Sequence, residues 1–288
     1  MRLLLPLLLT TAFGFAAVPT DKIENVRGLL RDHKFVEAAA AANALVAANR
    51  ADAAVYALLG KVEVAKGDAD AAVKACEKAV ELAPANSAYQ LQLGDTYGFA
   101  AQNAGMLSKM NFARKCRNAY EKAVELDPAN LDARGSLMGF YQMAPSVMGG
   151  GIDKAYEQAA AIRRLDAGRG HLAYAAVYAA DKKVDAAFTE YEEALKASPD
   201  DYTALYQLGK LAAVSGQSLD RGLGALRRCL ALAPPDAPGT PGHAAAQWRI
   251  GNILEKKNDT AAARTAYEAA LKIDPKFAPA ADALKKLK

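Results

Sequence analysis

Residues 244–275 read AAAQWRIGNILEKKNDTAAARTAYEAALKIDP, and this stretch decides the fold. Apolar residues recur in it at spacings of three and four on both sides of a polar break at 257–259, which is the pattern of amphipathic helices. Asp259 or Thr260 suits the cap of the second helix, and Pro275 marks the end of the segment. The stretch therefore predicts a hairpin of two antiparallel helices.

The same pattern returns along the chain, so an internal repeat organises this sequence. Gly251 and Pro275 are 24 positions apart, and so are Gly60 and Pro84 in the clean copy nearer the N-terminus. The apolar set makes up 52% of the residues but aromatics only 7%, which favours close packing of helices over a bulky globular core. A single hairpin cannot bury its apolar face, so we expect stacked neighbours to supply the core.

Glycine at position eight, alanine at twenty and proline at thirty-two of a repeat of about 34 residues resemble the tetratricopeptide repeat. The residues that carry the resemblance in the two clearest copies are Tyr56, Leu59, Gly60, Ala72, Ala79 and Pro84, and Ile250, Gly251, Ala263, Tyr267, Ala270 and Pro275. Further copies cover essentially everything after the N-terminal segment. The resemblance implies an all-α, right-handed α-solenoid of about seven helical hairpins plus a C-terminal capping helix.

The sequence predicts four parts. Residues 1–17 form a signal peptide, 18–50 a degenerate first hairpin, 51–275 the repeat solenoid, and 276–288 the capping helix. The first part has a positive start at Arg2 and an almost wholly apolar run that ends in small residues, as secretory signal peptides do. We expect cleavage and a periplasmic or secreted protein that is not integral to a membrane. A retained N-terminal anchor is the alternative, although the run is short for a span of ~20 residues.

Charge and motifs argue against several classes of function. The formal net charge of +4 is too mild to demand a polyanionic partner, and no nucleic-acid motif is present. His33, His171 and His243 are isolated and form no metal motif, and no nucleophile signature appears. We therefore expect no enzymatic activity, no cofactor, no metal and no nucleic acid.

Cysteines and tyrosines mostly fall on helix faces that the repeat pattern predicts to be buried. We expect Cys76, Cys116 and Cys229 to be small buried residues, with a Cys76–Cys116 bridge as the alternative. Six tyrosines occupy positions that pack helices together: Tyr97, Tyr120, Tyr141, Tyr178, Tyr191 and Tyr267.

The third repeat is longer than the others. Gly94 and Pro128 are 34 positions apart, ten more than in the clean copies, and residues 107–126 could form one long helix. The inserted segment is rich in apolar residues, among them Met106 and Met110. Two accounts stay open: the insertion packs against the neighbouring turn at 143–148, or it forms an adjustable lip at one end of a groove.

A candidate binding surface follows from the resemblance, because certain first-helix positions of such repeats face the hollow of the superhelix. Those positions hold Lys61, Asp95, Phe99, Leu172, Tyr206, Lys210, Trp248, Asn252 and Lys256. Large apolar side chains on that face are hard to explain by packing. The resemblance implies a protein–protein interaction scaffold that binds a partner's protein or peptide segment, and the expected export makes it a scaffold of the cell envelope. A glycan binder, or an accessory subunit of an envelope assembly or export machine, is the alternative.

Overall fold

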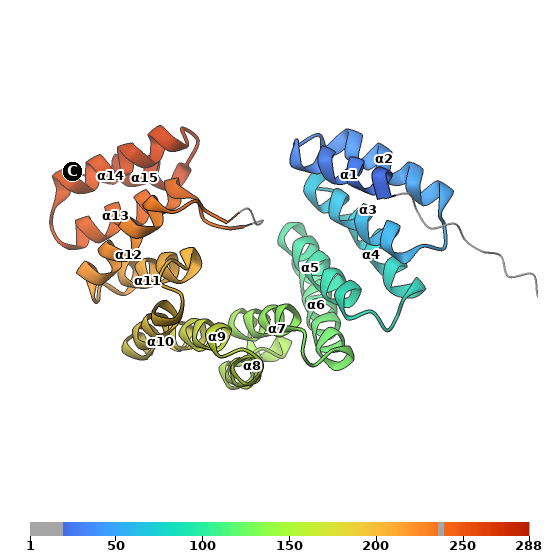
Figure 1. Cartoon of the computed structure of the whole chain (residues 1–288), viewed down its shortest axis with the longest axis horizontal. Coiled ribbons are helices and arrows are strands. Elements are labelled where there is room, and N and C mark those ends of the chain that lie inside the picture. The colour runs from blue at the N-terminus through green and yellow to red at the C-terminus, as the bar shows by residue number, and fades with distance from the viewer. Residues whose placement is uncertain (1–19, 236–238, 288) are drawn as a thin grey trace, which may run out of the picture. The chain divides into compact units, whose positions relative to one another are not determined.

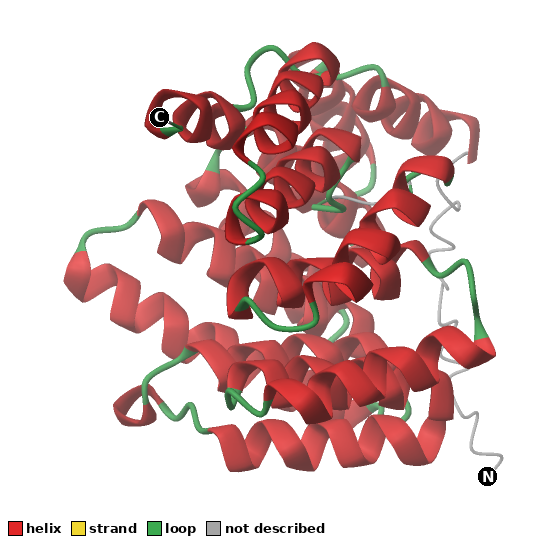
Figure 2. Cartoon of the chain, turned by 90° about the vertical axis from the view of Figure 1, so that its left-hand side faces the viewer, coloured by secondary structure: helices red, strands yellow, loops and turns green. Residues whose placement is uncertain are grey.

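Helices account for every regular element that the structure describes (Figure 1). The computed structural model describes residues 20–235 and 239–287, so the predicted signal peptide lies outside the described residues. Figure 2 shows the same helices joined by short loops. No described helix is long and apolar enough to cross a lipid bilayer.

The helices in chain order are α1 (Thr20–Arg31), α2 (Phe35–Ala48), α3 (Ala53–Lys66), α4 (Ala69–Leu82), α5 (Ser87–Asn103), α6 (Met106–Leu126), α7 (Leu131–Met143), the short 3₁₀ helix η1 (Ser146–Met148), α8 (Ile152–Leu165), α9 (Ala167–Ala180), α10 (Val184–Ala197), α11 (Tyr202–Ser215), α12 (Leu219–Ala231), α13 (His243–Lys256), α14 (Thr260–Ile273) and α15 (Ala278–Lys286).

Consecutive helices pair into hairpins. Contacts join the two helices of the hairpins α1–α2, α3–α4, α5–α6, α9–α10, α11–α12 and α13–α14, and α15 packs on α14. Neighbouring hairpins also contact one another, as at α2–α3, α4–α5, α8–α9, α10–α11 and α12–α13. Between them α7 and α8 are joined through η1. The fold class is therefore the predicted all-α solenoid of helical hairpins.

The chain divides into two compact units, unit 1 at Met1–Ala133 and unit 2 at Arg134–Lys288. The boundary falls inside α7. The Pro/Gly-rich stretch of sequence at 234–242 therefore does not mark this boundary.

In several hairpins the two helices approach each other closely at a glycine of the first helix. A Cβ atom on Gly60 would lie 2.3 Å from the sulfur of Cys76. The corresponding glycine of α5, Gly94, faces the ring of Tyr120, at 2.4 Å from an ideal Cβ to Cδ1. Glycine is required at these points because any side chain would separate the two helices.

Short polar side chains begin several helices. Asp52, Asp68 and Asp201 each accept a hydrogen bond from a backbone N–H in the first turn of α3, α4 and α11. Asp259 does the same for α14, accepting from Ala262 N at 3.0 Å, as its place in the sequence predicts. These caps satisfy N–H groups that have no partner within the helix.

The core runs along the stacked helices of each unit. Five of the six tyrosines assigned to packing are buried, and Tyr178 is half-buried. The three cysteines are free and buried, so the Cys76–Cys116 bridge is not formed. In unit 2, Ala280 of α15 and Leu287 pack against Tyr267, which has no exposed surface.

The long second helix of the third hairpin is confirmed. α6 has 21 residues, whereas α4 has 14. Met106, Leu107 and Met110 in its first turns are exposed, and so is Met143 at the end of α7. These large apolar side chains at the start of α6 and the end of α7 are therefore not buried.

Candidate partner-binding site

A pocket of about 510 Å³ lies in unit 2 between α9 and α11. We call it the α9–α11 pocket, and its lining residues are Gln142, Leu172, Ala176, Ala179, Ala180, Tyr191, Thr203, Gln207, Lys210, Leu211 and Val214. Leu172 and Lys210, which come from different repeats, were predicted as binding residues, and the structure brings them together here. Alanines on α9 leave the space that the pocket occupies.

One stripe of α11 forms the wall of this pocket. Thr203, Gln207, Lys210 and Val214 follow one another at spacings of four, three and four, which places them on one face of the helix. The other face of α11 is buried in the core, with Leu205 wholly enclosed. Val214 therefore stands in solvent at 63% exposure, although it is apolar.

The charge of the α9–α11 pocket is positive. Lys210 is exposed and forms no ion pair with any described residue, and none of the lining residues is acidic. Burial raises the pKa of the Tyr191 hydroxyl to about 12, so this phenol stays neutral in the pocket wall. The pocket can hold an apolar side chain and place a negative group beside Lys210.

A second pocket, of about 600 Å³, lies in unit 1 between α3 and α5. This α3–α5 pocket is lined by Arg27, Leu30, Ala54, Ala57, Leu58, Lys61, Ala88, Tyr89, Leu91, Gln92 and Asp95. It brings together two further predicted residues, Lys61 and Asp95. Asp95 has a structural partner, because its Oδ1 accepts a hydrogen bond of 2.7 Å from the hydroxyl of Tyr120.

Charges in the α3–α5 pocket are partly compensated. Arg27 pairs with Glu24 at 2.6 Å. Loss of solvent around the Asp95 carboxyl raises its pKa, and the hydrogen bond from Tyr120 and the charge of Lys61 oppose that rise. This pocket therefore offers a mixed polar surface rather than a single free charge.

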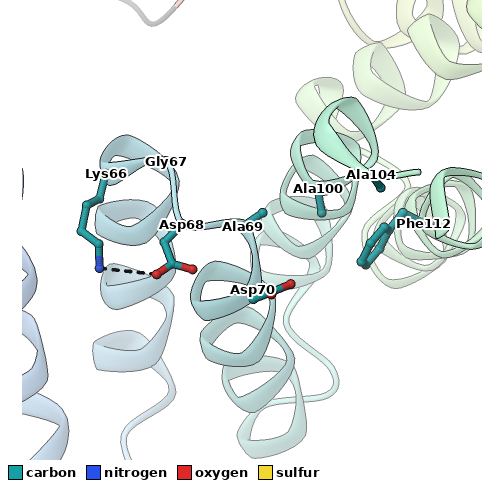
Figure 3. Close-up of a pocket in the computed structure, with 8 residues that line it drawn as sticks. All are labelled: Lys66, Gly67, Asp68, Ala69, Asp70, Ala100, Ala104 and Phe112. Atoms are coloured by element: carbon teal, nitrogen blue, oxygen red, sulfur yellow. Dashed lines mark ion pairs between the residues drawn. The ribbon is translucent and has the colours of Figure 1, made fainter. Parts of the chain in front are cut away.

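A third hollow, of about 470 Å³, lies between α4 and α6 in unit 1 (Figure 3). Figure 3 shows Asp70 of α4 and Phe112 of α6 on opposite sides of it, with Ala100 and Ala104 behind. Asp68 at its rim pairs with Lys66 at 3.7 Å. None of the predicted binding residues lines this hollow.

Tyr206 corrects our expectation of an exposed groove residue. It is only 5% exposed and belongs to the core cluster of unit 2, together with Tyr202 and Leu205. Its helix contacts α13 as well as α12, so the apolar face of α11 is wider than that of a helix in a lone hairpin.

The remaining predicted residues lie outside the three pockets. The half-buried ring of Trp248 packs edge-on against Phe277 at 6.0 Å, and the guanidinium of Arg249 lies 4.0 Å from its centroid. Asn252 accepts a hydrogen bond of 2.8 Å from Tyr267. Phe99 is half-buried and Lys256 is exposed.

Sequence reasoning missed the pocket residues Thr203, Gln207 and Val214. Their spacing on α11 was a usable signal, because it follows from Lys210 by single helical turns. The alanines of α9 gave no such signal, since alanine is common throughout this chain. Among residues 20–235 and 239–287, no three His, Cys, Asp or Glu side chains gather as metal ligands.

Comparisons with known proteins give the family. Three sequence models of the tetratricopeptide repeat family match this chain, at residues 53–86, 168–211 and 206–276. No protein of curated function matches this sequence.

Solved structures share the fold at low sequence identity. A tetratricopeptide repeat protein from Parabacteroides merdae has a TM-score of 0.65 at 14% identity, over 92% of this chain and 97% of that one. A thermophilic TPR protein from Thermus thermophilus has a TM-score of 0.54 at 15% identity, over 67% and 97%. PilF from Pseudomonas aeruginosa has a TM-score of 0.53 at 14% identity, over 81% and 97%. The hairpin order, the glycine contacts and these matches together make the chain a tetratricopeptide repeat protein.

Proposed function

We propose that this protein is an envelope scaffold that holds a segment of a partner protein in the α9–α11 pocket. The tetratricopeptide repeat fold supports a protein–protein interaction scaffold in general. One observation carries the finer proposal: exposed Val214 and unpaired Lys210 share one face of α11 at the mouth of an apolar pocket. Such a pairing of an apolar hollow with a single charge gives both affinity and register.

The chemistry of the pocket defines the segment that it accepts. A large aliphatic or aromatic side chain would fill the space above Leu172 and Leu211, and an acidic neighbour would pair with Lys210. Gln207 and Thr203 would bond to the backbone of the segment. Glycan binding is less well supported. Of the aromatic rings predicted to face the groove that could stack on a sugar, Tyr206 is buried and Trp248 packs on Phe277.

Peptide binding tests this function. We would measure fluorescence anisotropy with peptides that carry one large apolar residue next to Asp or Glu, and with matched peptides that carry Lys instead. Acidic peptides should bind more tightly, and Lys210→Glu should reverse the preference. Lys272→Glu, an exposed change on α14 outside the pocket, is the matched control. Equal loss of binding in both variants, or no preference between the peptides, would contradict the proposal.

Export is a separate part of the proposal. It rests on the apolar N-terminal segment with its positive start at Arg2 and small residues near Ala17. Fractionation of cells followed by N-terminal sequencing tests it. We expect mature protein that begins near Ala17 or Val18 in the soluble exported fraction. Intact Met1 on membrane-bound protein would show a retained anchor.

A further inference from the structure

The N-terminal end of α6 extends beyond the part of the helix that is buried in its hairpin. α6 is seven residues longer than α4, its counterpart in the preceding hairpin, and seven residues add ~10 Å of helix at 1.5 Å per residue. The C-terminal half of α6 packs inside the hairpin, because Cys116, Ala119 and Tyr120 are buried. The first turns have no buried residue.

Three large apolar side chains stand in solvent on these first turns. Met106, Leu107 and Met110 are 83%, 85% and 50% exposed. Met106 and Met110 are one helical turn apart, and Leu107 lies beside them, so the three form one continuous patch. Among the described residues of unit 1, the other large hydrophobic side chain with such exposure is Val36, which stands alone on α2.

The patch is surrounded by positive charge. Residues 106–120 contain four cations and no acidic residue. Lys115 pairs with Glu77 and Arg117 lies 3.6 Å from Glu121, which leaves Lys109 and Arg114 without an ion pair among the described residues. Arg114 bonds only to the neutral side chain of Asn111, at 2.9 Å.

Acidic groups of the neighbouring elements do not neutralise this end. Asp68 and Asp70 of the preceding hairpin line the hollow between α4 and α6, on the side of α6 that carries Phe112 (Figure 3). Asp68 is already paired with Lys66. Phe112 is half-buried against the ring of Tyr97, at 6.2 Å between centroids.

We propose that this end of α6, the α6 tip, docks on an anionic lipid surface. Apolar side chains flanked by cations are the composition of helices that bind at the membrane interface. The methionines and Leu107 would enter the acyl boundary, while Lys109 and Arg114 would pair with phosphate groups of the lipids. This role goes beyond the scaffold function, because none of these residues lines the α9–α11 pocket.

A lipid surface fits the tip better than a folded protein partner does. Three side chains at the end of one helix offer far less area than the ~800 Å² per partner that a stable protein interface buries. A fluid bilayer needs no matching cavity, and flexible methionines adapt to it. The charge of the tip then selects anionic over neutral lipid.

A fluorescent label on the tip gives a readout that the apolar N-terminal segment does not confuse. The three native cysteines are buried, so Leu107→Cys provides one accessible thiol in the full-length chain for an environment-sensitive dye. Val36→Cys, at another exposed apolar position of unit 1, carries the dye in the control. Both proteins are titrated with vesicles of phosphatidylcholine, with and without phosphatidylglycerol.

We expect a blue shift of the dye at residue 107 with the anionic vesicles and none at residue 36. Lys109→Gln with Arg114→Gln should weaken the binding by about 25-fold, since each cation near an anionic surface contributes about fivefold in affinity. Lys182→Gln with Lys272→Gln, which are exposed and in unit 2, should leave it unchanged. Added salt should weaken the binding as well.

Three results would overturn the proposal. The first is an unchanged dye at residue 107 while the protein sediments with the vesicles. The second is an equal shift at residues 36 and 107. The third is a shift at residue 107 that grows with protein concentration in the absence of lipid, which would assign the tip to contact between copies of this chain.

Discussion

The ring of Tyr267 fills the space that a Cβ atom on Gly251 would need. The distance from that ideal Cβ to Cε1 of Tyr267 is 2.2 Å, and the ring itself has no exposed surface. The last full hairpin is closed by this contact, since Gly251 lies on α13 and Tyr267 on α14. Ala280 of α15 belongs to the same buried cluster as this ring.

Gly251→Ala should lower the free energy of unfolding by about 1–3 kcal/mol, because the rigid buried ring has no room to move away. Gly224→Ala is the matched control. It lies within α12 and a Cβ there meets nothing within 4 Å, so the change should raise stability by about 0.5–1 kcal/mol. Urea denaturation of the two variants measures both effects. Equal behaviour of the two would mean that the α13–α14 contact is looser than the structure has it.

The hydroxyl of Tyr267 can be separated from its ring. Its single proton is shared between two acceptors at the end of α13, Oδ1 of Asn252 and the carboxylate of Glu255. Tyr267→Phe should cost about 1–3 kcal/mol, as for a hydrogen bond to a charged group, whereas Tyr267→Ala should cost on the order of 3–5 kcal/mol. Chemical denaturation monitored by Trp248 fluorescence checks both values. A loss below about 1 kcal/mol for the alanine variant would contradict the burial of the ring.

Contacts between a glycine of the first helix and the side chain that faces it on the second helix explain why the fold could be predicted from sequence. Gly251 and Tyr267 are 16 positions apart, as are Gly60 and Cys76, whereas Gly94 and Tyr120 are 26 apart. The contact is the same in all three hairpins, so the ten extra residues had to lengthen the hairpin rather than break it. The close approach of the two helices at a glycine involves only residues of one hairpin, so it could be predicted from the sequence pattern.

Exposure on the first helices could not be predicted as well. Tyr206 and Val214 both lie on α11, yet the tyrosine is buried and the valine is 63% exposed. The difference depends on α13, which packs on α11 from two helices further along the chain. The repeat pattern predicts the contacts within one hairpin, so it does not predict the contact between α11 and α13.

Stability and binding should therefore separate on α11. Tyr206→Ala opens a cavity in the core of unit 2 and should cost about 3–5 kcal/mol. Val214→Ser changes an exposed side chain and should leave stability within about 0.5 kcal/mol of the unchanged protein. Thermal unfolding measured on both variants tests this. A large loss of stability in Val214→Ser alone would place that side chain in the core.

The Glu77 carboxyl gives stability a dependence on acid pH. Burial favours its neutral form, but hydrogen bonds from Tyr97 at 2.6 Å and Lys115 at 3.1 Å outweigh burial and hold its pKa below the ordinary value. A depressed pKa stabilises the fold at pH values above the unfolded pKa of about 4.3, and the contribution is lost as pH falls through the folded pKa. Glu77→Gln should therefore be less stable than the unchanged protein at pH 6, and the difference should shrink towards pH 3.

Glu125→Gln is the control for this pH series, because Glu125 is an exposed partner of Lys122 on α6. Its effect on stability should be small at every pH, as for most exposed ion pairs. Denaturant titrations across the pH range compare the two variants. A difference for Glu77→Gln that stays constant from pH 6 to pH 3 would show that its pKa is the same in the folded and unfolded chain.

The three thiols should react only when the protein unfolds. Burial raises the pKa of Cys116 to about 11 and that of Cys229 to about 12, so neither forms much thiolate at pH 8. Burial also raises the pKa of Cys76, although hydrogen bonds with Thr96 and Gln92 oppose the rise. Because the thiolate is the reactive form, we expect a disulfide reagent at pH 8 to modify none of them in the folded protein and all of them in guanidinium chloride.

Partial unfolding would reveal the order in which the units open, since Cys76 and Cys116 lie in unit 1 and Cys229 in unit 2. A fast reaction of one thiol under native conditions would contradict its burial, and the mass of the modified peptide would say which hairpin opens.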